Sequence, residues 1–446
     1  MKLIKPVSTL LTLLPSIAYI PVLIEFLKGF HLGGLNIIYL FINSAIRPSL
    51  DVVILKSAWE GIQITIATGL TSWVISMFIG IFLGILSTDL FWENIPNLSF
   101  LSKVLKYSLA IPRSIHEVIW GLLFIQFLGL NIWVAIISIV IPYSALTARV
   151  VSGQLDSFDR KSHIALKQSG SNISASLITI ILPKLLPLIS TYGSYRLECA
   201  IRGVTLLGIF GLGGIGTELY LTLKSFEFRE MWTCLWMLFI VMILLEKFIR
   251  FSRVKLLRNI NLKNSLLIST SIFSLSLTVG LSWLYNLGFD IFSRLRFSYL
   301  TFPSFEELVY AVQTLPLLQL IAKTTLITFL GSGIAIGTPP LLLLIFPDKF
   351  YLKVQNLIWI FFRLIPSPLT TILILLFTNP TISVAALSLG ITHMGAMGRL
   401  LTDNILNQEK DIYRAIRRNG SNKKSATLFG ILTPQSKSYL AYGAYR

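Results

Sequence analysis

Residues 61–88 read GIQITIATGLTSWVISMFIGIFLGILST, a stretch in which no side chain is charged. About 20 consecutive apolar residues, wound into a helix, are enough to cross the roughly 30 Å hydrocarbon core of a membrane. A soluble helix seldom stays free of charge for so long, because one of its faces must meet water. This stretch therefore predicts a helix that spans a membrane.

The rest of the chain repeats this pattern, with further charge-free runs at 6–24, 118–148, 264–289, 324–347 and 364–398. Of the 446 residues, 54% are hydrophobic and 13% are charged, against about 25% charged in an ordinary soluble domain. This composition excludes a soluble enzyme and, despite a net charge of +18, an ordinary nucleic-acid binder. We expect an all-α polytopic membrane protein with about 11 transmembrane helices. These are placed near 7–28, 62–87, 104–127, 129–149, 172–195, 230–247, 264–287, 318–345, 354–378, 380–398 and 425–446.

The basic residues are unevenly distributed, and nearly half of them lie in the stretches 149–167, 246–263 and 399–424. Lys and Arg near the ends of spans collect on the cytoplasmic side of a membrane. We therefore predict that all three stretches are cytoplasmic. The N-terminus, with Lys2 and Lys5, is predicted to lie on the same side.

Three local features need separate interpretation. The first apolar run resembles a signal peptide, but Pro15 and Pro21 interrupt it and no small-x-small cleavage site follows. We interpret it as a retained first span.

The Gly-rich segment 197–229 is expected to form a re-entrant or broken helix that protein shields from lipid. The spacing of Cys199 and Cys234 fits neither a zinc site nor a disulfide framework, so both are expected to be packing residues.

The two halves of the chain share landmarks at a constant offset of 250 residues. The matched positions are Arg113 and Arg363, Arg149 and Arg399, Ala165 and Ala415, Gly170 and Gly420, and the segments 192–196 and 442–446. We expect two parallel membrane units, 1–250 and 264–446, joined by a basic cytoplasmic linker at 251–263, with a pathway at their interface. The second unit lacks counterparts of 198–250, so we expect it to be C-terminally incomplete and the gene product to extend roughly 50 residues further.

Each basic loop carries an Ala-x4-Gly element, Ala165 with Gly170 and Ala415 with Gly420, and the first copy continues to an I-I-L-P run that ends at Pro183. The pattern resembles the coupling-helix signature E-A-A-x3-G-x9-I-x-L-P of binding-protein-dependent ABC importer permeases, although the Glu and the second Ala are replaced. A Gly with positive φ can end a short helix that docks on another protein. A plain amphipathic loop is the alternative, but two copies at one offset favour docking of an ATPase.

Residues 195–216, YRLECAIRGVTLLGIFGLGGIG, resemble the Y-R-x-E-x3-R…L-G-x-x-G-x-G-G-I-G signature of phosphonate-type permeases. Residues 113–120, RSIHEVIW, are similar to that family's R-x-I-P-E-x-x-W segment, with His116 in place of Pro. The resemblance is strong over most of 60–250 and weaker over 310–446. It implies the transmembrane subunit of a phosphonate-type importer, with two permease halves fused in one chain.

The glycine cluster of this motif also satisfies the dinucleotide pattern G-x-G-x-x-G, but its flanks are predicted spans rather than a strand and a helix. Nucleotide binding is therefore rejected, and we expect the cluster to serve close helix packing or a gate. The residues concerned are Gly208, Gly211, Gly213, Gly214 and Gly216. The chain has no G-x4-G-K-[ST] phosphate loop, so ATP hydrolysis would belong to a partner chain. His31, His163 and His393 are isolated, and we expect neither a metal nor a cofactor.

Charged side chains close to the predicted spans mark a candidate translocation path. They are Arg113, Glu117, Arg363, Glu198 and Arg202. A charge at the membrane centre costs at least ~2.5–3.5 kcal/mol on insertion scales and usually faces a cavity or a partner. Arg113 and Glu117 are four residues apart and are expected on one helical face, as are Glu198 and Arg202. The Arg fork suits phosphonate or phosphate oxygens, but Arg–Glu pairs that only fix helix packing are an equal alternative.

Residues and resemblance together predict a permease subunit, not an enzyme, of an ATP-driven importer for phosphonate or a related oxyanion such as phosphite or phosphate. Its expected partners are a dimeric cytoplasmic ATP-binding subunit, an extracytoplasmic substrate-binding protein and membrane lipid, with no nucleic acid. We expect a multi-pass protein of the inner cell membrane with a cytoplasmic N-terminus. The alternatives are an ABC permease for another solute such as methionine, or an ion-coupled secondary transporter, which twin coupling loops disfavour.

Overall fold

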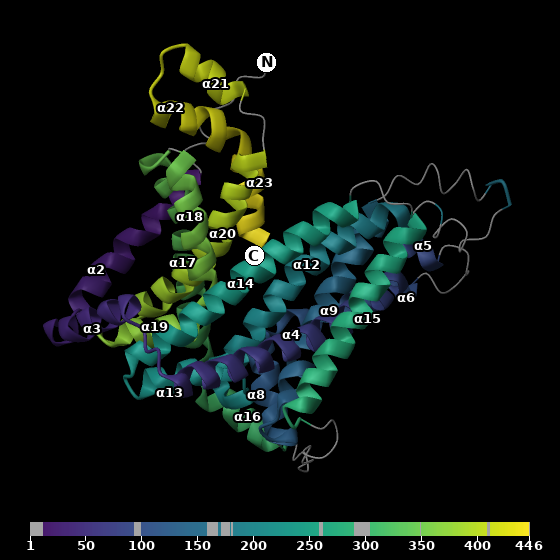
Figure 1. The fold of residues 1–446 in the computed structure, drawn as a ribbon, viewed down its shortest axis with the longest axis horizontal. Helices are drawn as coiled ribbons and strands as arrows, with labels where there is room; N and C mark the ends of the chain where they lie inside the picture. The colour runs from purple at the N-terminus through teal and green to yellow at the C-terminus, as the bar shows by residue number, and fades with distance from the viewer. Residues whose placement is uncertain are drawn as a thin grey trace. The chain divides into compact units, whose positions relative to one another are not determined.

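The computed structural model describes residues 12–92, 100–157, 168–170, 179, 182–257, 262–289, 304–347, 349–407 and 411–445. Over these residues the chain forms helices joined by turns, and no β-strand occurs among them, which confirms the all-α class (Figure 1). Five of these helices are long and apolar enough to cross a membrane, or up to eight spans form if each bent helix pair counts as one. The expected total of about 11 stays a prediction.

The described helices fall into two compact units, one drawn from 48–301 and the other from 1–47 and 302–446. The first contains α4 (Val52–Leu86), α5 (Asp89–Trp92), α6 (Phe100–Ser108), α7 (Ala110–Ser114), α8 (Glu117–Leu128), α9 (Ile132–Ser157), α12 (Leu182–Leu207), α13 (Ile215–Lys224), α14 (Phe228–Leu257) and α15 (Leu262–Asn286). The second contains α2 (Tyr19–Gly29), α3 (Leu35–Ile46), α16 (Phe305–Thr314), α17 (Leu317–Ile345), α18 (Lys349–Leu364), α19 (Ser367–Leu375), α20 (Ile382–Asn407), α21 (Asp411–Arg418), α22 (Lys423–Thr427) and α23 (Thr433–Tyr445).

The unit of residues 48–301 is built on the close packing of α4 against α9, which run side by side in Figure 1. A Cβ atom added to Gly80 would lie 2.5 Å from Cβ of Thr147, and one added to Gly84 would lie 2.6 Å from Cβ of Val151. Only glycine lets the two backbones approach this closely, as small residues do where helices pack inside membranes. The stretch that predicted a membrane helix thus also supplies the contact surface of this unit.

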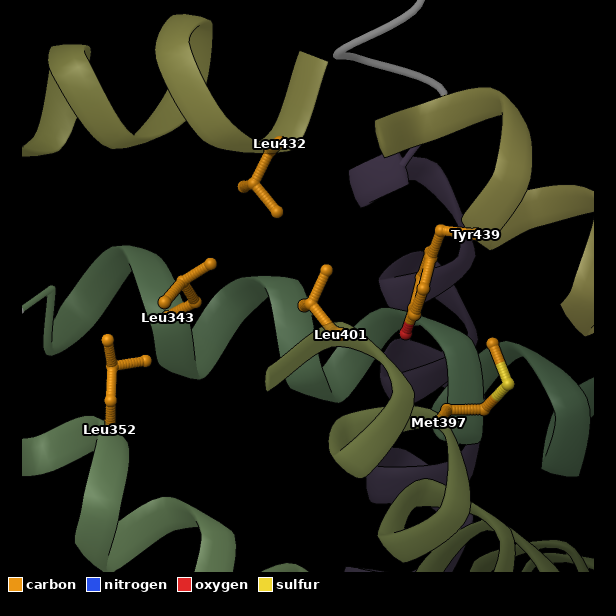
Figure 2. Close-up of a cluster of buried hydrophobic side chains, with 6 residues drawn as sticks. All are labelled: Leu343, Leu352, Met397, Leu401, Leu432 and Tyr439. Carbon is orange, nitrogen blue, oxygen red and sulfur yellow. The ribbon is translucent and has the colours of Figure 1, made fainter. Parts of the chain in front are cut away.

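The other unit repeats this plan with α17 against α20, and α18 and α23 complete its core. Figure 2 shows its cluster of buried side chains, which come from these four helices and the π-helical turn Leu428–Leu432: Leu343, Leu352, Met397, Leu401, Leu432 and Tyr439. The Tyr439 hydroxyl donates a hydrogen bond of 2.7 Å to the carbonyl oxygen of Ile336 in α17. A phenol can be buried here because its one polar atom finds an acceptor.

The backbone repeats at the offset predicted from the sequence. α9 spans Ile132–Ser157 and α20 spans Ile382–Asn407, so both bounds differ by 250 residues. In the same register, α8 begins at Glu117 and α19 begins at Ser367. The matched landmarks therefore stand at equivalent places in two copies of one helical plan.

The compact units do not coincide with the predicted sequence units 1–250 and 264–446. α2 packs against α20, and its last residue, Gly29, accepts a 3.1 Å hydrogen bond from the backbone N–H of Asn379. In the other compact unit, α15 packs against α4, where Phe273 stacks on Trp73 with ring centroids 4.9 Å apart. The first span of each sequence unit thus buries its apolar face against helices of the other sequence unit.

Candidate functional site

A sharp bend interrupts the helix that the sequence predicted over 104–127. α7 ends at Ser114, α8 begins at Glu117, and the two segments are bent by 82°. Ile115 and His116 between them have extended backbone angles. The expectation that Arg113 and Glu117 share one helical face is therefore wrong, because the helical register is broken between them.

Glu117, the first residue after the bend, faces the neighbouring helices α9 and α12. Its carboxylate oxygen Oε1 lies 3.3 Å from the Tyr143 hydroxyl, whose one proton is shared between this oxygen and the carbonyl oxygen of Cys199 at 3.2 Å. The Glu117 side chain is only 12% exposed. A Cβ atom added to Gly203 of α12 would lie 3.3 Å from the same oxygen. The imidazole of His116 lies 3.5 Å from Oε2. Glu117 is thus held against two helices that the sequence did not connect with it.

The structure also places Arg196 in an aromatic cage that sequence reasoning missed. Its guanidinium carbon lies 5.0 Å from the ring centroids of Tyr143 and Tyr192 and 5.8 Å from that of Tyr195. Its Nε donates a hydrogen bond of 2.5 Å to the Tyr192 hydroxyl. Stacked aromatic faces stabilise a desolvated cation. The spacing of Tyr192 and Arg196 on one helix was a visible signal, but nothing in the apolar run around Tyr143 marked that residue.

The predicted pair of Glu198 and Arg202 is present on α12. Arg202 Nη2 donates to Glu198 Oε1 over 3.0 Å, and each side chain is 19% exposed. The Nε–H of Arg202 is buried and meets no acceptor among the described residues. The pairing satisfies one arm of the guanidinium and leaves another donor available inside the protein.

The arginines matched by the repeat differ in their surroundings. Arg113 is half-buried, and its guanidinium makes no ion pair or hydrogen bond with the described part of the chain. Arg363 is only 7% exposed, and a Cβ atom added to Gly395 of α20 would lie 2.9 Å from its Cγ. Packing of α20 therefore covers Arg363, whereas Arg113 keeps an open side.

The glycine cluster forms the turn between α12 and α13, whose axes are bent by 54°. Gly211, Gly213 and Gly214 have φ of +87°, +93° and +83°, a region that L-residues rarely adopt. A Cβ atom on Gly208 would lie 2.6 Å from the carbonyl oxygen of Gly213, and one on Gly216 would lie 1.9 Å from that of Thr205. These contacts support the packing role and the expected helix break, and no strand precedes the cluster within the described residues.

The coupling segments are described in part. Gly170 and Gly420 have φ of +83° and +80°, the positive values expected for residues that end a short helix. Ala415 is exposed on α21, which ends two residues before Gly420. Ala165 lies outside the described residues, and Pro183 is the second residue of α12. The two matched glycines thus share a conformation as well as an offset.

The second coupling segment is braced against its own unit. A Cβ atom on Gly430 would lie 2.8 Å from the Cα atom of Tyr413, so α21 lies directly on the π-helical turn Leu428–Leu432. The side chains of Arg414, Arg417 and Arg418 are exposed. A short, basic, amphipathic helix is therefore presented on a firm support, which suits contact with an acidic surface of another protein.

Comparison with known proteins gives a family match over part of the chain. Residues 76–261 match the family described as "Binding-protein-dependent transport system inner membrane component". The chain is 27% identical over 105 residues to a cryptic phosphonate transport system permease protein, PhnE2, of Escherichia coli (strain K12), a match that covers 24% of this chain and 84% of that protein. It is 24% identical over 136 residues to the phosphite transport system permease protein PtxC of Stutzerimonas stutzeri, covering 30% of this chain and 50% of that protein.

A solved structure shows a more distant likeness. A chain in a structure of the MetNI methionine ABC transporter in an inward-facing conformation is 21% identical, with a TM-score of 0.40, and the match covers 46% of this chain and 94% of that chain. The family match over residues 76–261 and the apolar helices agree with a membrane-embedded component of a transport system.

Proposed function

We propose that this chain is the membrane permease of an ATP-driven importer for phosphonate or a related oxyanion, phosphite or phosphate. The observation that carries the proposal is the cluster where α8, α9 and α12 meet, which holds Glu117, Arg196 and Arg202. Arg196, held against aromatic rings, and Arg202, paired with the carboxylate of Glu198, provide hydrogen-bond donors for an oxyanion. Neither arginine is left as an isolated charge in the membrane. The names of the relatives support the same class of substrate.

Charged residues around this cluster would form the translocation path. Glu198 compensates part of the charge of Arg202, so the path would hold an anion weakly and release it, as transport requires. Arg113, half-buried next to the bend, would meet the anion in passing, and Arg363 is its counterpart in the repeat. Gly211 and its neighbours would let the turn between α12 and α13 move as a gate.

Energy would come from a separate dimeric ATPase that docks on residues 150–170 and 400–420 of two fused permease halves, with the N-terminus in the cytoplasm. An extracytoplasmic binding protein would deliver the substrate. The shared positive φ of Gly170 and Gly420 supports this assignment, because this conformation of glycine commonly ends a helix.

The test is purification of the tagged chain from its native membranes, followed by ATPase assays and by uptake of radiolabelled phosphite, phosphate and methionine into vesicles. We expect a co-purifying ATP-hydrolysing subunit and ATP-dependent uptake of phosphite or phosphate. ATP-dependent uptake of methionine alone would overturn the oxyanion assignment. Uptake driven by an ion gradient without ATP would show a secondary transporter and overturn the coupling assignment as well.

A further inference from the structure

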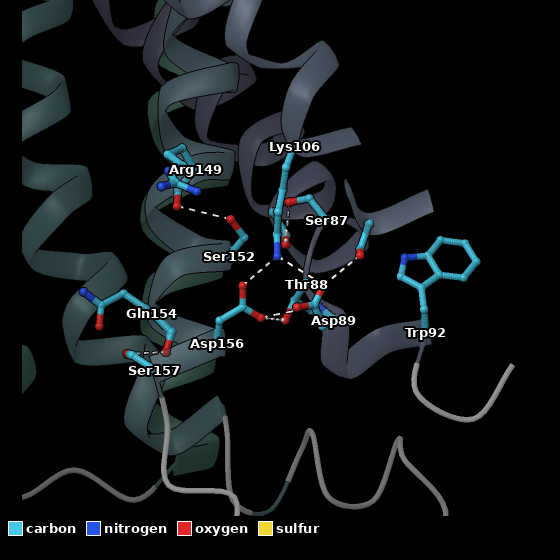
Figure 3. A network of polar contacts seen from close by, with 12 residues as sticks. Ser87, Thr88, Asp89, Trp92, Lys106, Arg149, Ser152, Gln154, Asp156 and Ser157 are labelled. Atoms are coloured by element: carbon cyan, nitrogen blue, oxygen red, sulfur yellow. Dashed lines mark hydrogen bonds and ion pairs between the residues drawn. The ribbon is translucent and has the colours of Figure 1, made fainter. Parts of the chain in front are cut away.

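We propose that Lys106 links the first coupling segment, 164–170, to the bent helix pair formed by α6–α7 and α8. Movement of this segment would then change the bend angle. This inference rests on the proposed function. Figure 3 shows the Lys106 ammonium between two carboxylates. Its Nζ lies 2.9 Å from Asp156 Oδ2 and 3.2 Å from Asp89 Oδ1. Lys106 belongs to α6, Asp89 to α5 and Asp156 to the last turn of α9. One cation therefore joins three separate helices.

Hydroxyl groups hold both carboxylates in place. Thr88 Oγ1 donates to Asp156 Oδ1 over 2.7 Å, and Ser102 Oγ donates to Asp89 Oδ1 over 2.7 Å. Thr88 and Ser102 are almost completely buried. An isolated surface ion pair contributes little to stability. A network in which the carboxylates are held by hydroxyl groups and the cation is only 21% exposed is more rigid than such a pair.

The position of this network in the chain indicates its role. Asp156 is the second-last residue of α9, and the chain continues from there toward the first coupling segment, 164–170. α6 leads through α7 to the 82° bend. A displacement of the coupling segment would therefore pull on α9 and, through Lys106, on the arm of the bend that α6 and α7 form.

The other arm of the bend is fixed to the same helix. The Tyr143 hydroxyl of α9 lies within hydrogen-bond distance of the Glu117 carboxylate of α8, as described above. Tyr143 and Asp156 are about 20 Å apart along α9, from a helical rise of ~1.5 Å per residue. Because α9 holds both arms at two points along its length, movement of α9 reaches both arms of the bend, and a change of the bend angle must shift at least one of the two contacts.

The second half of the chain lacks this device. At an offset of 250, Lys106 corresponds to Asn356 and Asp156 to Leu406, while Glu117 corresponds to Ser367. The Oδ1 atom of Asn356 is buried and has no hydrogen-bond partner within the described residues. The two halves would therefore transmit movement unequally, with the first half carrying the link between the ATPase and the bend.

The test uses the full chain with its ATPase and binding protein in vesicles, and measures both ATP hydrolysis and uptake of radiolabelled phosphite. We expect Lys106→Met to lower uptake about tenfold while hydrolysis stays within about twofold, an effect in the usual range of coupling between sites. Lys106→Arg should keep both activities. Lys103→Met, at an exposed lysine of the same helix without an ion pair among the described residues, is the matched control and should change neither.

A double-mutant cycle separates coupling from simple structural damage. Asp156→Asn should also uncouple uptake from hydrolysis, and the double variant Lys106→Met/Asp156→Asn should be no worse than either single variant. Additive losses, parallel loss of both activities, or no effect of Lys106→Met would overturn the link. Absence of both uptake and an associated ATPase in the unaltered chain would instead overturn the proposed function.

Discussion

Gly216 provides the sharpest test of the packing in the glycine cluster. It occupies the second position of α13, and a Cβ atom there would lie 1.9 Å from the carbonyl oxygen of Thr205 in α12. Carbon and oxygen atoms in contact normally stay ~3.3 Å or more apart. Gly216→Ala must therefore separate the two backbones by about 1.4 Å, and no flexible side chain can absorb this shift.

The expected cost follows from this displacement. Overpacking of a well-packed core costs about 1–3 kcal/mol, and a clash with backbone belongs at the upper end. At ~2 °C per kcal/mol for a unit of this size, Gly216→Ala should lower the Tm by about 6 °C. Gly153→Ala is the matched control, because Gly153 also lies within a helix but has nothing within 4 Å of an added Cβ atom. It should stabilise the protein by about 0.5–1 kcal/mol.

The assay is thermal unfolding of the detergent-purified chain, followed by intrinsic tryptophan fluorescence, with all variants at the same protein and detergent concentrations. Membrane yield before purification serves as a second readout. Equal Tm values for Gly216→Ala and Gly153→Ala would refute the reasoning, because the added methyl group meets a backbone carbonyl at Gly216 and open space at Gly153.

Three further changes test the site and the coupling segments. Gly170→Val and Gly420→Val should each abolish uptake of phosphite while leaving the chain in the membrane, because valine rarely adopts φ near +80°; normal uptake and ATPase stimulation in both would refute the coupling assignment. Tyr143→Phe removes the donor to Glu117 and to the carbonyl oxygen of Cys199 and should lower the free energy of unfolding by about 1–3 kcal/mol, measured by thermal unfolding; an unchanged Tm would show that these contacts are not stabilising. Arg202→Ala should reduce uptake and destabilise α12, whereas Arg202→Lys should keep the charge and lose most of the uptake, since a fork and a point charge bind oxyanions differently; full uptake by both variants would remove Arg202 from the path.

Some features of this protein were predictable because they depend only on neighbours along the chain. Charge-free runs predicted membrane helices. The offset of 250 between matched residues predicted that α9 recurs as α20 at the equivalent place in the second half. The positive φ of Gly170 and Gly420 also follows from local sequence, because glycine adopts the left-handed conformation that commonly ends a helix without a steric penalty.

Other features depended on contacts between distant segments. The sequence placed Arg113 and Glu117 on one face, but the bend separates them, because α8 turns its first residue toward Tyr143 and Gly203. Likewise, nothing along the chain linked Arg196 with Tyr143. Local pattern sets which residues can share a helical face, whereas the packing of helices decides which faces meet.

The same distinction applies to the compact units and to the Lys106 network. Both repeats carry a first span of similar apolarity, and apolarity alone does not specify which helix a hydrophobic face packs against. The shapes of the packed surfaces in the folded protein therefore pair α2 with α20 and α15 with α4. Lys106, Asp89 and Asp156 are three ordinary charges in the sequence. The sequence by itself determined the all-α class, the long apolar helices and their repeat. The tertiary structure decided where helices break and which charges work together, because electrostatic contacts require a few ångströms of approach that only packing brings about.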